Sequence, residues 1–157
     1  MSRMRLVLAV GFAVLLAGSV PAGAEVITNE RVDFTGLTVF VPCANGGAGE
    51  LVALEGRLHR LFAVTIDKAG GFHMKDHTQP QGLRGVGSVT GAKYQANGVD
   101  QQQMNGHVGL TLTSMSNLRL IGQGRGNNLL VRETFHITVN ANGVVTALHD
   151  SFTAECK

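Results

Sequence analysis

Apolar and polar residues alternate with a period of two along much of the chain, as in residues 51–66, 108–112 and 129–139. These stretches are rich in Val, Leu, Thr and Phe and lack the spacing of an amphipathic helix. The pattern predicts strands near residues 31–41, 50–66 (bent at Gly56), 72–78, 84–96, 107–114, 117–122, 129–140 and 144–155. About eight such strands predict an all-β, single antiparallel domain, with a β-barrel favoured over a two-sheet sandwich.

Turn residues separate many of these stretches. Four Asn-Gly pairs supply the positive φ angles of tight hairpin turns, namely Asn45-Gly46, Asn97-Gly98, Asn105-Gly106 and Asn142-Gly143. Residues 67–71 and 79–82 are two further predicted turns. Turns at this frequency favour neighbouring strands that run antiparallel.

The last predicted hairpin defines a candidate site. A two-residue turn at Asn142-Gly143 places Glu133, Phe135, Asp150 and Phe152 on one mainly apolar face, with the two carboxylates diagonal to each other. All four are candidate ligand-binding residues inside a barrel, where a few polar groups would orient a bound molecule. Glu133 and Asp150 are also candidate catalytic residues for acid–base chemistry. Alternatively, they pair with an Arg or with backbone N–H groups and have no chemical role.

Six histidines are candidate metal ligands. The predicted register makes His136 and His149 cross-strand partners on the face opposite Glu133, close enough to share an ion. A zinc site needs a third or fourth ligand, and none is evident on that face. His73 and His77 lie about 13 Å apart if they share a strand, which is too far for one ion. The alternative is that these histidines simply face solvent.

The first 24 residues have the features of a secretory signal peptide. Arg3 and Arg5 precede an apolar run from Leu6 to Ala17, and small residues follow at Ala22-Gly23-Ala24. The run is short for a membrane span. Cleavage near Ala24 would leave a single β-rich domain of residues 25–157. The mature protein is therefore expected to be secreted, either extracellular or periplasmic, without membrane insertion.

Cys43 and Cys156 are the two cysteines of the chain. In an oxidising compartment, a pair without metal-like spacing predicts one disulfide, although two free reactive thiols are the alternative. Closing so long a loop would stabilise the fold by about 4 kcal/mol in the chain-entropy model.

Charge argues against a nucleic-acid partner. The whole chain has 13 Lys and Arg against 11 Asp and Glu, but Arg3 and Arg5 belong to the predicted signal, which leaves the two signs balanced. The remaining cations are scattered among carboxylates along the sequence, so no basic patch is evident. These cations include Arg57, Arg60, Lys75, Lys93 and Arg132.

Several kinds of chemistry lack their motifs. The glycine clusters at 82–87 and 122–126 have no helix pattern after them, which a phosphate-binding loop requires. The chain has no Trp and one Tyr, so it lacks aromatic platforms for sugars, and it has no Gly-x-Ser-x-Gly nucleophile elbow. No cofactor is expected.

Several segments resemble a group of small exported bacterial proteins of unassigned function. The resemblance spans most of the mature chain and implies export, a β-rich domain and the terminal cysteine pair. It is carried by Pro42-Cys43, residues 49–52, His73 and His77, Thr90-Gly91 with Tyr94, residues 118–124, residues 133–138, Asn142-Gly143 and Cys156.

Three functions fit the sequence. The first is a secreted β-barrel that binds a small, largely apolar ligand in its lumen. The second is an extracellular protein-interaction or structural module without a pocket, for which an exposed apolar patch would be the sign. The third is an isomerase or cyclase that uses Glu133 and Asp150.

Overall fold

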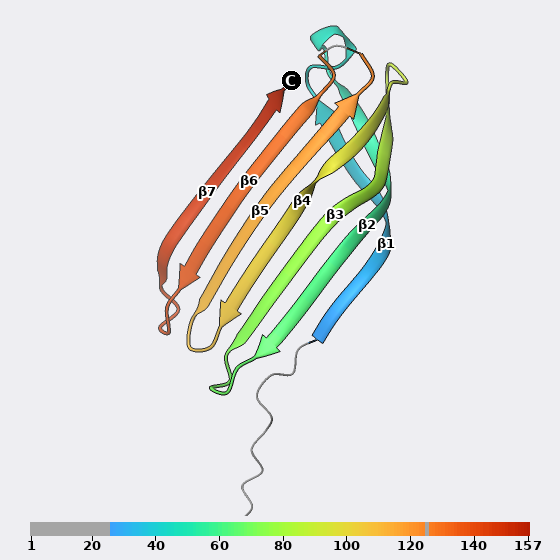
Figure 1. Ribbon diagram of the computed structural model, residues 1–157. Helices are drawn as coiled ribbons and strands as arrows, with labels where there is room; N and C mark the ends of the chain where they lie inside the picture. Colours follow the sequence, from blue (N-terminus) through green and yellow to red (C-terminus); the bar gives the residue numbers. More distant parts are fainter. Residues whose placement is uncertain (1–25, 125) are drawn as a thin grey trace, which may run out of the picture.

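The computed structural model describes residues 26–124 and 126–157, so the predicted signal segment lies outside the described residues. Seven strands follow one another as a simple antiparallel meander, with a short 3-10 turn, η1 (Asn45–Gly47), after the first (Figure 1). The strands are β1 (Val26–Val41), β2 (Glu50–Ile66), β3 (Phe72–Gly87), β4 (Lys93–Gly106), β5 (Leu110–Gly122), β6 (Leu129–Val139) and β7 (Val145–Cys156). The all-β antiparallel prediction is confirmed.

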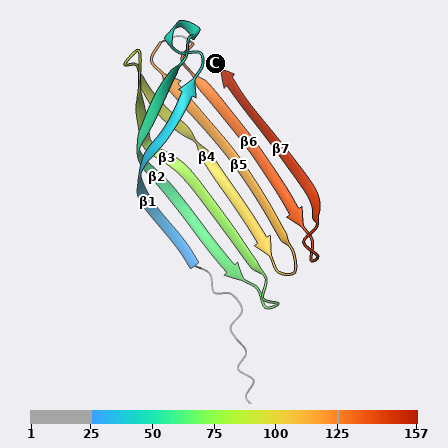
Figure 2. The same ribbon diagram turned by 180° about the vertical axis from the view of Figure 1, so that it is seen from behind.

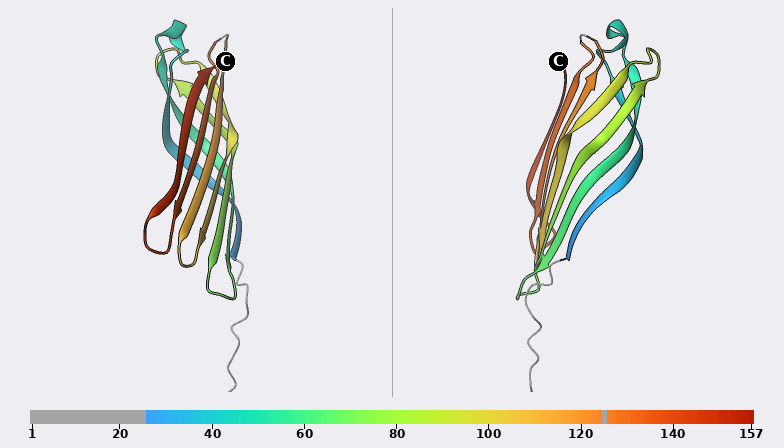
Figure 3. Two further views of the ribbon diagram at one scale, coloured as in Figure 1. Left: turned by 90° about the vertical axis from the view of Figure 1, so that its left-hand side faces the viewer. Right: turned by 45° about the vertical axis from the view of Figure 1, so that its right-hand side comes forward.

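The predicted barrel closure is not observed. The strand order runs from β1 to β7 without pairing between these two, so both are edges of one open sheet. The sheet is a single layer whose upper end curls, and the upper parts of β1 and β2 cross over one face of the strands that follow (Figures 2 and 3).

The register explains why the curl stays local. Bulges increase the bend and twist of a sheet, and the shifts in the pairing of β1 to β4 lie between Thr35 and Leu37, between Glu55 and Arg57, and between Thr78 and Arg84. All three occur in the middle or upper part of the strands. Below them the ladders of β1 to β4 are continuous, and the sheet does not curve enough to bring β1 against β7.

Two predicted turns lie inside strands, and the predicted strand at 84–96 is divided between the end of β3 and the start of β4; the strand count falls from eight to seven because two other predicted strands are one. Residues 79–82 and Pro80 belong to β3, where Pro80 faces Leu58 and has no partner on β4, as expected of a proline in a sheet irregularity. Asn97-Gly98 belongs to β4. The predicted strands at 107–114 and 117–122 form parts of one strand, β5. The turn at 67–71 is confirmed by the bond from Asp67 N–H to Gly71 O, 2.8 Å.

The core lies at the curled upper end. Leu54, Leu120 and Leu129 are fully buried there, together with Val41, Ala44, Val52, Leu83, Tyr94 and Ala96. We call the face of the sheet that carries these side chains the inner face, and the opposite face the outer face. Because side chains alternate along a strand, the register assigns every other strand residue to one of the two faces.

The predicted disulfide is present. Cys43, just after β1, is bonded to Cys156 at the end of β7, with a Cα–Cα distance of 6.0 Å and 113 residues of sequence separation. The bond therefore joins the upper ends of two strands that do not pair with each other. Within the described residues, no helix has the length and apolar character to cross a membrane.

Candidate functional site

The structure confirms the predicted register of the last hairpin over most of its length. Glu133 faces Phe152, Phe135 faces Asp150, and all four lie on the inner face. The turn itself differs from the prediction. Asn140 N–H bonds to Val144 O at 2.9 Å and Gly143 has φ of 76°, so the loop is one residue longer, and a register shift after Thr138 restores the expected pairing.

The two candidate carboxylates are not enclosed. Glu133 and Asp150 are both exposed, and neither has a hydrogen bond or ion pair to another side chain of the described residues. Neither of the two described hollows is lined by them. Their partners differ in exposure: Phe135 is half-buried, whereas Phe152 is 64 % exposed. The four residues share a face, as predicted, but it is an open surface rather than a lumen.

The predicted histidine pair is also adjacent, on the outer face, where His136 faces His149. Both ring nitrogens of His136 contact threonine hydroxyls: Nδ1 lies 2.9 Å from Thr113 Oγ1 and Nε2 lies 3.2 Å from Thr138 Oγ1. No cluster of three or more His, Cys, Asp or Glu suited to a metal occurs among the described residues. The geometry therefore places His136 in a hydrogen-bond network of the sheet surface.

Other outer-face histidines follow the same pattern. His59 contacts Asn29 at 2.6 Å, and His73 contacts Asn105 at 2.8 Å across neighbouring strands. His77 contacts Gln101 on β4 at 3.0 Å. These three imidazoles therefore form hydrogen bonds with neutral side-chain amides of neighbouring strands.

The sheet separates charges by sign, which the linear sequence hides. Among the described residues, the inner face carries one cation, Arg60, while its exposed and half-buried carboxylates are Glu30, Asp76, Asp100, Glu133 and Asp150. The outer face carries Arg31, Arg57, Lys75, Arg84, Lys93, Arg119 and Arg132 against Asp33, Glu55 and Glu155. The expectation of scattered cations is thus corrected, because Arg57, Lys75, Lys93 and Arg132 share one face.

Carboxylates of the inner face influence one another. Arg60 Nε donates to both oxygens of Asp76, at 2.8 and 3.1 Å, and the guanidinium lies 5.1 Å from the centre of the Phe62 ring. Burial raises the pKa of Asp100, and the negative charge of Asp76 adds to this rise, while hydrogen bonds with Ser116 and Gln102 oppose it. Arg60 thus neutralises Asp76 and leaves Asp100, Glu133 and Asp150 without a partner cation on the inner face.

Edge strand β7 exposes apolar side chains beside these carboxylates. Leu148 and Phe152 lie on the inner face on either side of Asp150 and are 65 % and 64 % exposed. Val145, farther along the same face, is 51 % exposed. Large apolar side chains grouped on an edge strand are typical of a contact surface rather than of a free edge.

Glu50 is a buried carboxylate that the sequence analysis missed. It is 2 % exposed and accepts hydrogen bonds from Thr90 N–H (2.9 Å), Thr90 Oγ1 (2.8 Å), Val89 N–H (3.2 Å) and Tyr94 OH (3.0 Å). Backbone donation by Thr90 is the main cause that lowers the pKa of Glu50, while the pKa of Tyr94 rises to about 12 because the phenol is buried against this carboxylate. Glu50 has all its acceptor sites occupied and fixes the β3–β4 loop.

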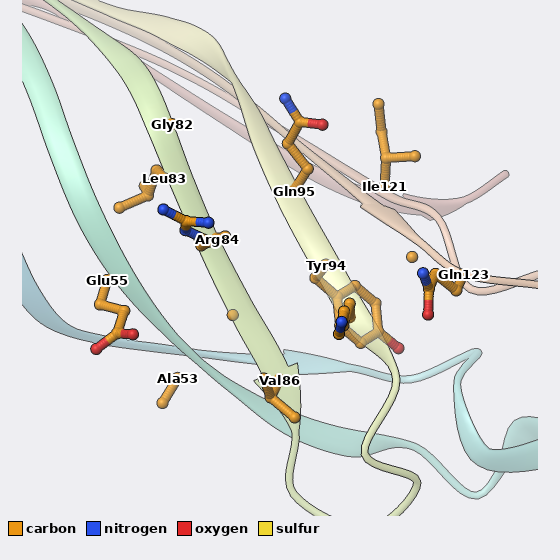
Figure 4. Close-up of a pocket in the computed structure, with 13 residues that line it drawn as sticks. Ala53, Glu55, Gly82, Leu83, Arg84, Val86, Tyr94, Gln95, Ile121 and Gln123 are labelled. Atoms are coloured by element: carbon orange, nitrogen blue, oxygen red, sulfur yellow. The ribbon is translucent and has the colours of Figure 1, made fainter.

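The larger of the described hollows lies on the upper part of the outer face (Figure 4) and has a volume of about 880 Å³. Arg84 and Lys93 line it with two glutamines and with apolar side chains from β2, β3 and β5. A smaller hollow of about 450 Å³ lies at Asn29, Glu30, Arg31 and His59.

No family model, curated protein or solved structure matches this chain.

Proposed function

We propose that this chain is an exported protein-interaction module that binds a basic, extended segment of a partner protein as an added strand along β7. The observation that carries the proposal is the combination, at one edge of the sheet, of exposed apolar side chains on β7 with the carboxylates of Asp150 on β7 and Glu133 on β6, which have no partner cation. Strand addition to an exposed edge is a common mode of peptide recognition, with affinity from main-chain hydrogen bonds and specificity from alternate side chains.

The backbone of β7 supports this mode of binding. Lys157 N–H donates to Asn128 O at 2.9 Å, and the β6–β7 register continues in phase from there. In an antiparallel pair, alternate residues direct both peptide groups toward the partner strand. Residues 149, 151, 153 and 155 therefore pair with β6, whereas the N–H and C=O groups of Leu148, Asp150, Phe152 and Ala154 point away from the sheet.

The same four residues direct their side chains to the inner face. An added strand in register would therefore place every second side chain next to Leu148, Asp150, Phe152 and Ala154. Apolar residues would cover the two large side chains, and a Lys or Arg between them would approach Asp150 and reach Glu133 on β6. The absence of an inner-face cation other than Arg60 among the described residues favours a basic segment over an acidic one.

The opposite edge is protected against the same pairing. β1 carries Glu30, Arg31 and Asp33 in its exposed part and is distorted by the bulge between Thr35 and Leu37. Charges and bulges are the usual means by which edge strands avoid added partners. The described part of β7 has its only register shift at the hairpin end, which leaves most of the strand regular.

In the part of the chain that the structure describes, the two other hypotheses lack the cavity that they need. A small apolar ligand in a lumen requires a closed or deeply concave inner face, and the sheet is open. Catalysis by Glu133 and Asp150 requires a substrate pocket beside them, whereas both are exposed and outside the described hollows. The interaction module requires only the open edge and its side chains.

The test uses a fluorescent synthetic peptide in which every second residue is threonine and the residues between them are, in order, valine, lysine and valine. Its binding to the disulfide-bonded protein is measured by fluorescence anisotropy. We expect saturable binding that weakens by about tenfold or more when the lysine is replaced by glutamate. If the protein does not bind the peptide and instead binds a fatty acid on the inner face, the proposal is overturned in favour of the small-ligand hypothesis.

Two variants locate the binding on β7. Ala154→Pro removes one outward N–H without disturbing the β6 ladder and should abolish binding, while Asp150→Lys should weaken it by about tenfold or more through charge repulsion. Asp33→Lys makes the same charge change on the outer face of β1 and serves as the matched control, with binding unchanged. Binding that survives both β7 changes would refute this site.

A further inference from the structure

The hollow on the outer face is formed where β3 bends. Glu55, Arg84, Gln95 and Ile121 lie side by side in one row across β2 to β5, and Ala53, Val86 and Lys93 lie in the next row. Gln123 completes this second row through its N–H bond to Lys93 O, 3.2 Å. Figure 4 shows Arg84 between Glu55 on one side and Gln95 and Ile121 on the other.

The charged groups of the hollow are available to a ligand. Arg84 and Lys93 are exposed, and neither has a hydrogen bond or ion pair from its side chain to any described residue. Glu55 faces Arg84 in the register but lies beyond ion-pair distance. Gln95 and Gln123 add amide groups on the β4–β5 side, so the hollow has a guanidinium, an ammonium and two amide donors around one space.

An apolar wall accompanies these donors. Val86 is 56 % exposed, although it lies in the middle of a cationic surface, and Ala53 and Ile121 flank it. A ligand that only carried charge would leave this apolar surface in contact with water. A ligand with an apolar body would cover it and gain hydrophobic stabilisation.

We infer that this hollow is a binding site for a small monocarboxylate with an apolar body. The carboxylate lies at Arg84, whose planar guanidinium binds it with two parallel hydrogen bonds, and Lys93 contributes a second positive charge. Glu55 makes the net charge of the hollow that of a single cation, which matches a monoanion and disfavours phosphate dianions. The apolar body lies against Val86 and Ile121.

The site is independent of the proposed strand addition. The hollow occupies the upper outer face, whereas the partner strand would pair with the edge of β7 and contact side chains of the inner face. The probe is hydrocinnamate, titrated into the isotopically labelled, disulfide-bonded protein while amide NMR shifts are recorded. We expect saturable shifts at Gly85, Gly122 and Gln123, and no such shifts with hydrocinnamyl alcohol, which has the same body without the charge. Absence of saturable shifts at these amides would overturn the inference.

Variants separate the site from general attraction to a basic face. Arg84→Gln should weaken hydrocinnamate binding by about tenfold or more, because it removes a charged hydrogen-bonding partner. Arg132→Gln removes an exposed outer-face arginine outside the hollow and should leave binding unchanged. Glu55→Gln should tighten binding and admit phenyl phosphate. Equal weakening by Arg84→Gln and Arg132→Gln would show nonspecific attraction and refute the site.

Discussion

The disulfide holds together two ends of the sheet that no hydrogen-bond ladder joins, and its removal should therefore be costly. The double change Cys43→Ala and Cys156→Ala removes a cross-link that spans 113 residues. In the chain-entropy relation, the cross-link lowers the conformational entropy of the unfolded chain by about 16 cal/mol/K. Removing it should therefore lower the free energy of unfolding by about 5 kcal/mol at 25 °C. A typical domain has a total stability of about 5–15 kcal/mol, so the variant should be marginally stable.

The chain provides its own reporter for this experiment. Tyr94 is the single tyrosine and there is no tryptophan, and Tyr94 is 2 % exposed within the upper core. Urea unfolding followed by tyrosine fluorescence should show a lower midpoint for the double variant and a steeper slope, because an unfolded chain without the cross-link exposes more surface. A loss of less than about 1 kcal/mol would refute the claim that this cross-link is a major source of stability.

Three further predictions concern single residues. Glu50→Gln should destabilise the fold at neutral pH, and because the folded state lowers the pKa of Glu50, the wild type should lose this contribution as pH falls below the ordinary glutamate value; urea midpoints at pH 7 and pH 3 measure both effects. Gly56→Ala should cost about 3 kcal/mol, since φ is 143° and a Cβ would lie 2.6 Å from Gly82 O, whereas Gly82→Ala, with no atom within 4 Å of its Cβ, should cost about 1 kcal/mol; equal losses in thermal unfolding would contradict the steric argument. Asp100→Asn should be more stable than the wild type at pH 7, and this difference should shrink at pH 4, because the raised folded-state pKa of Asp100 makes the wild type lose stability as pH rises through it. A variant less stable than the wild type at both pH values would show that Asp100 is needed for packing or hydrogen bonding.

The sequence predicted the parts of the structure that depend on local pattern. Alternation in residues 129–140 and 144–155 fixed the pairing of His136 with His149 and the shared face of Glu133 and Phe152. The cysteine pair and the turn at Asp67 were also correct. In each case the controlling residues lie in one hairpin or are the two cysteines of the chain.

Closure of the sheet could not be predicted in this way, because a barrel, a sandwich and an open sheet share the same alternation. It depends on where bulges curve the strands, and the pairing shifts at Thr35, Glu55 and Thr78 appear only once neighbouring strands are aligned. Gly98 is an example. Its Asn-Gly sequence resembles a hairpin turn, yet Gly98 lies inside β4. There its φ of 143° and missing side chain allow the backbone of Asn117 on β5 to approach closely.

The residues of the candidate site were predicted to share one face, which is correct, but their exposure to solvent was not predicted. Glu133, Phe135, Asp150 and Phe152 do share the inner face, but their exposure follows from the missing partner strand beyond β7. The separation of charge between the faces depends on the register of all seven strands, since neighbours in sequence such as Glu133 and Arg132 point to opposite sides. Glu50 needed the distant Thr90 and Tyr94 to be recognised as a buried carboxylate.

Amide hydrogen exchange along β7 tests the central claim most directly. The account predicts that in the free protein the amides of Asp150, Phe152 and Ala154 exchange rapidly, while those of His149, Ser151 and Thr153 are protected by β6. Addition of the lysine-containing peptide should then protect the first group. Protection of Asp150, Phe152 and Ala154 in the free protein, or no change on peptide addition, would contradict an open edge that receives a partner strand.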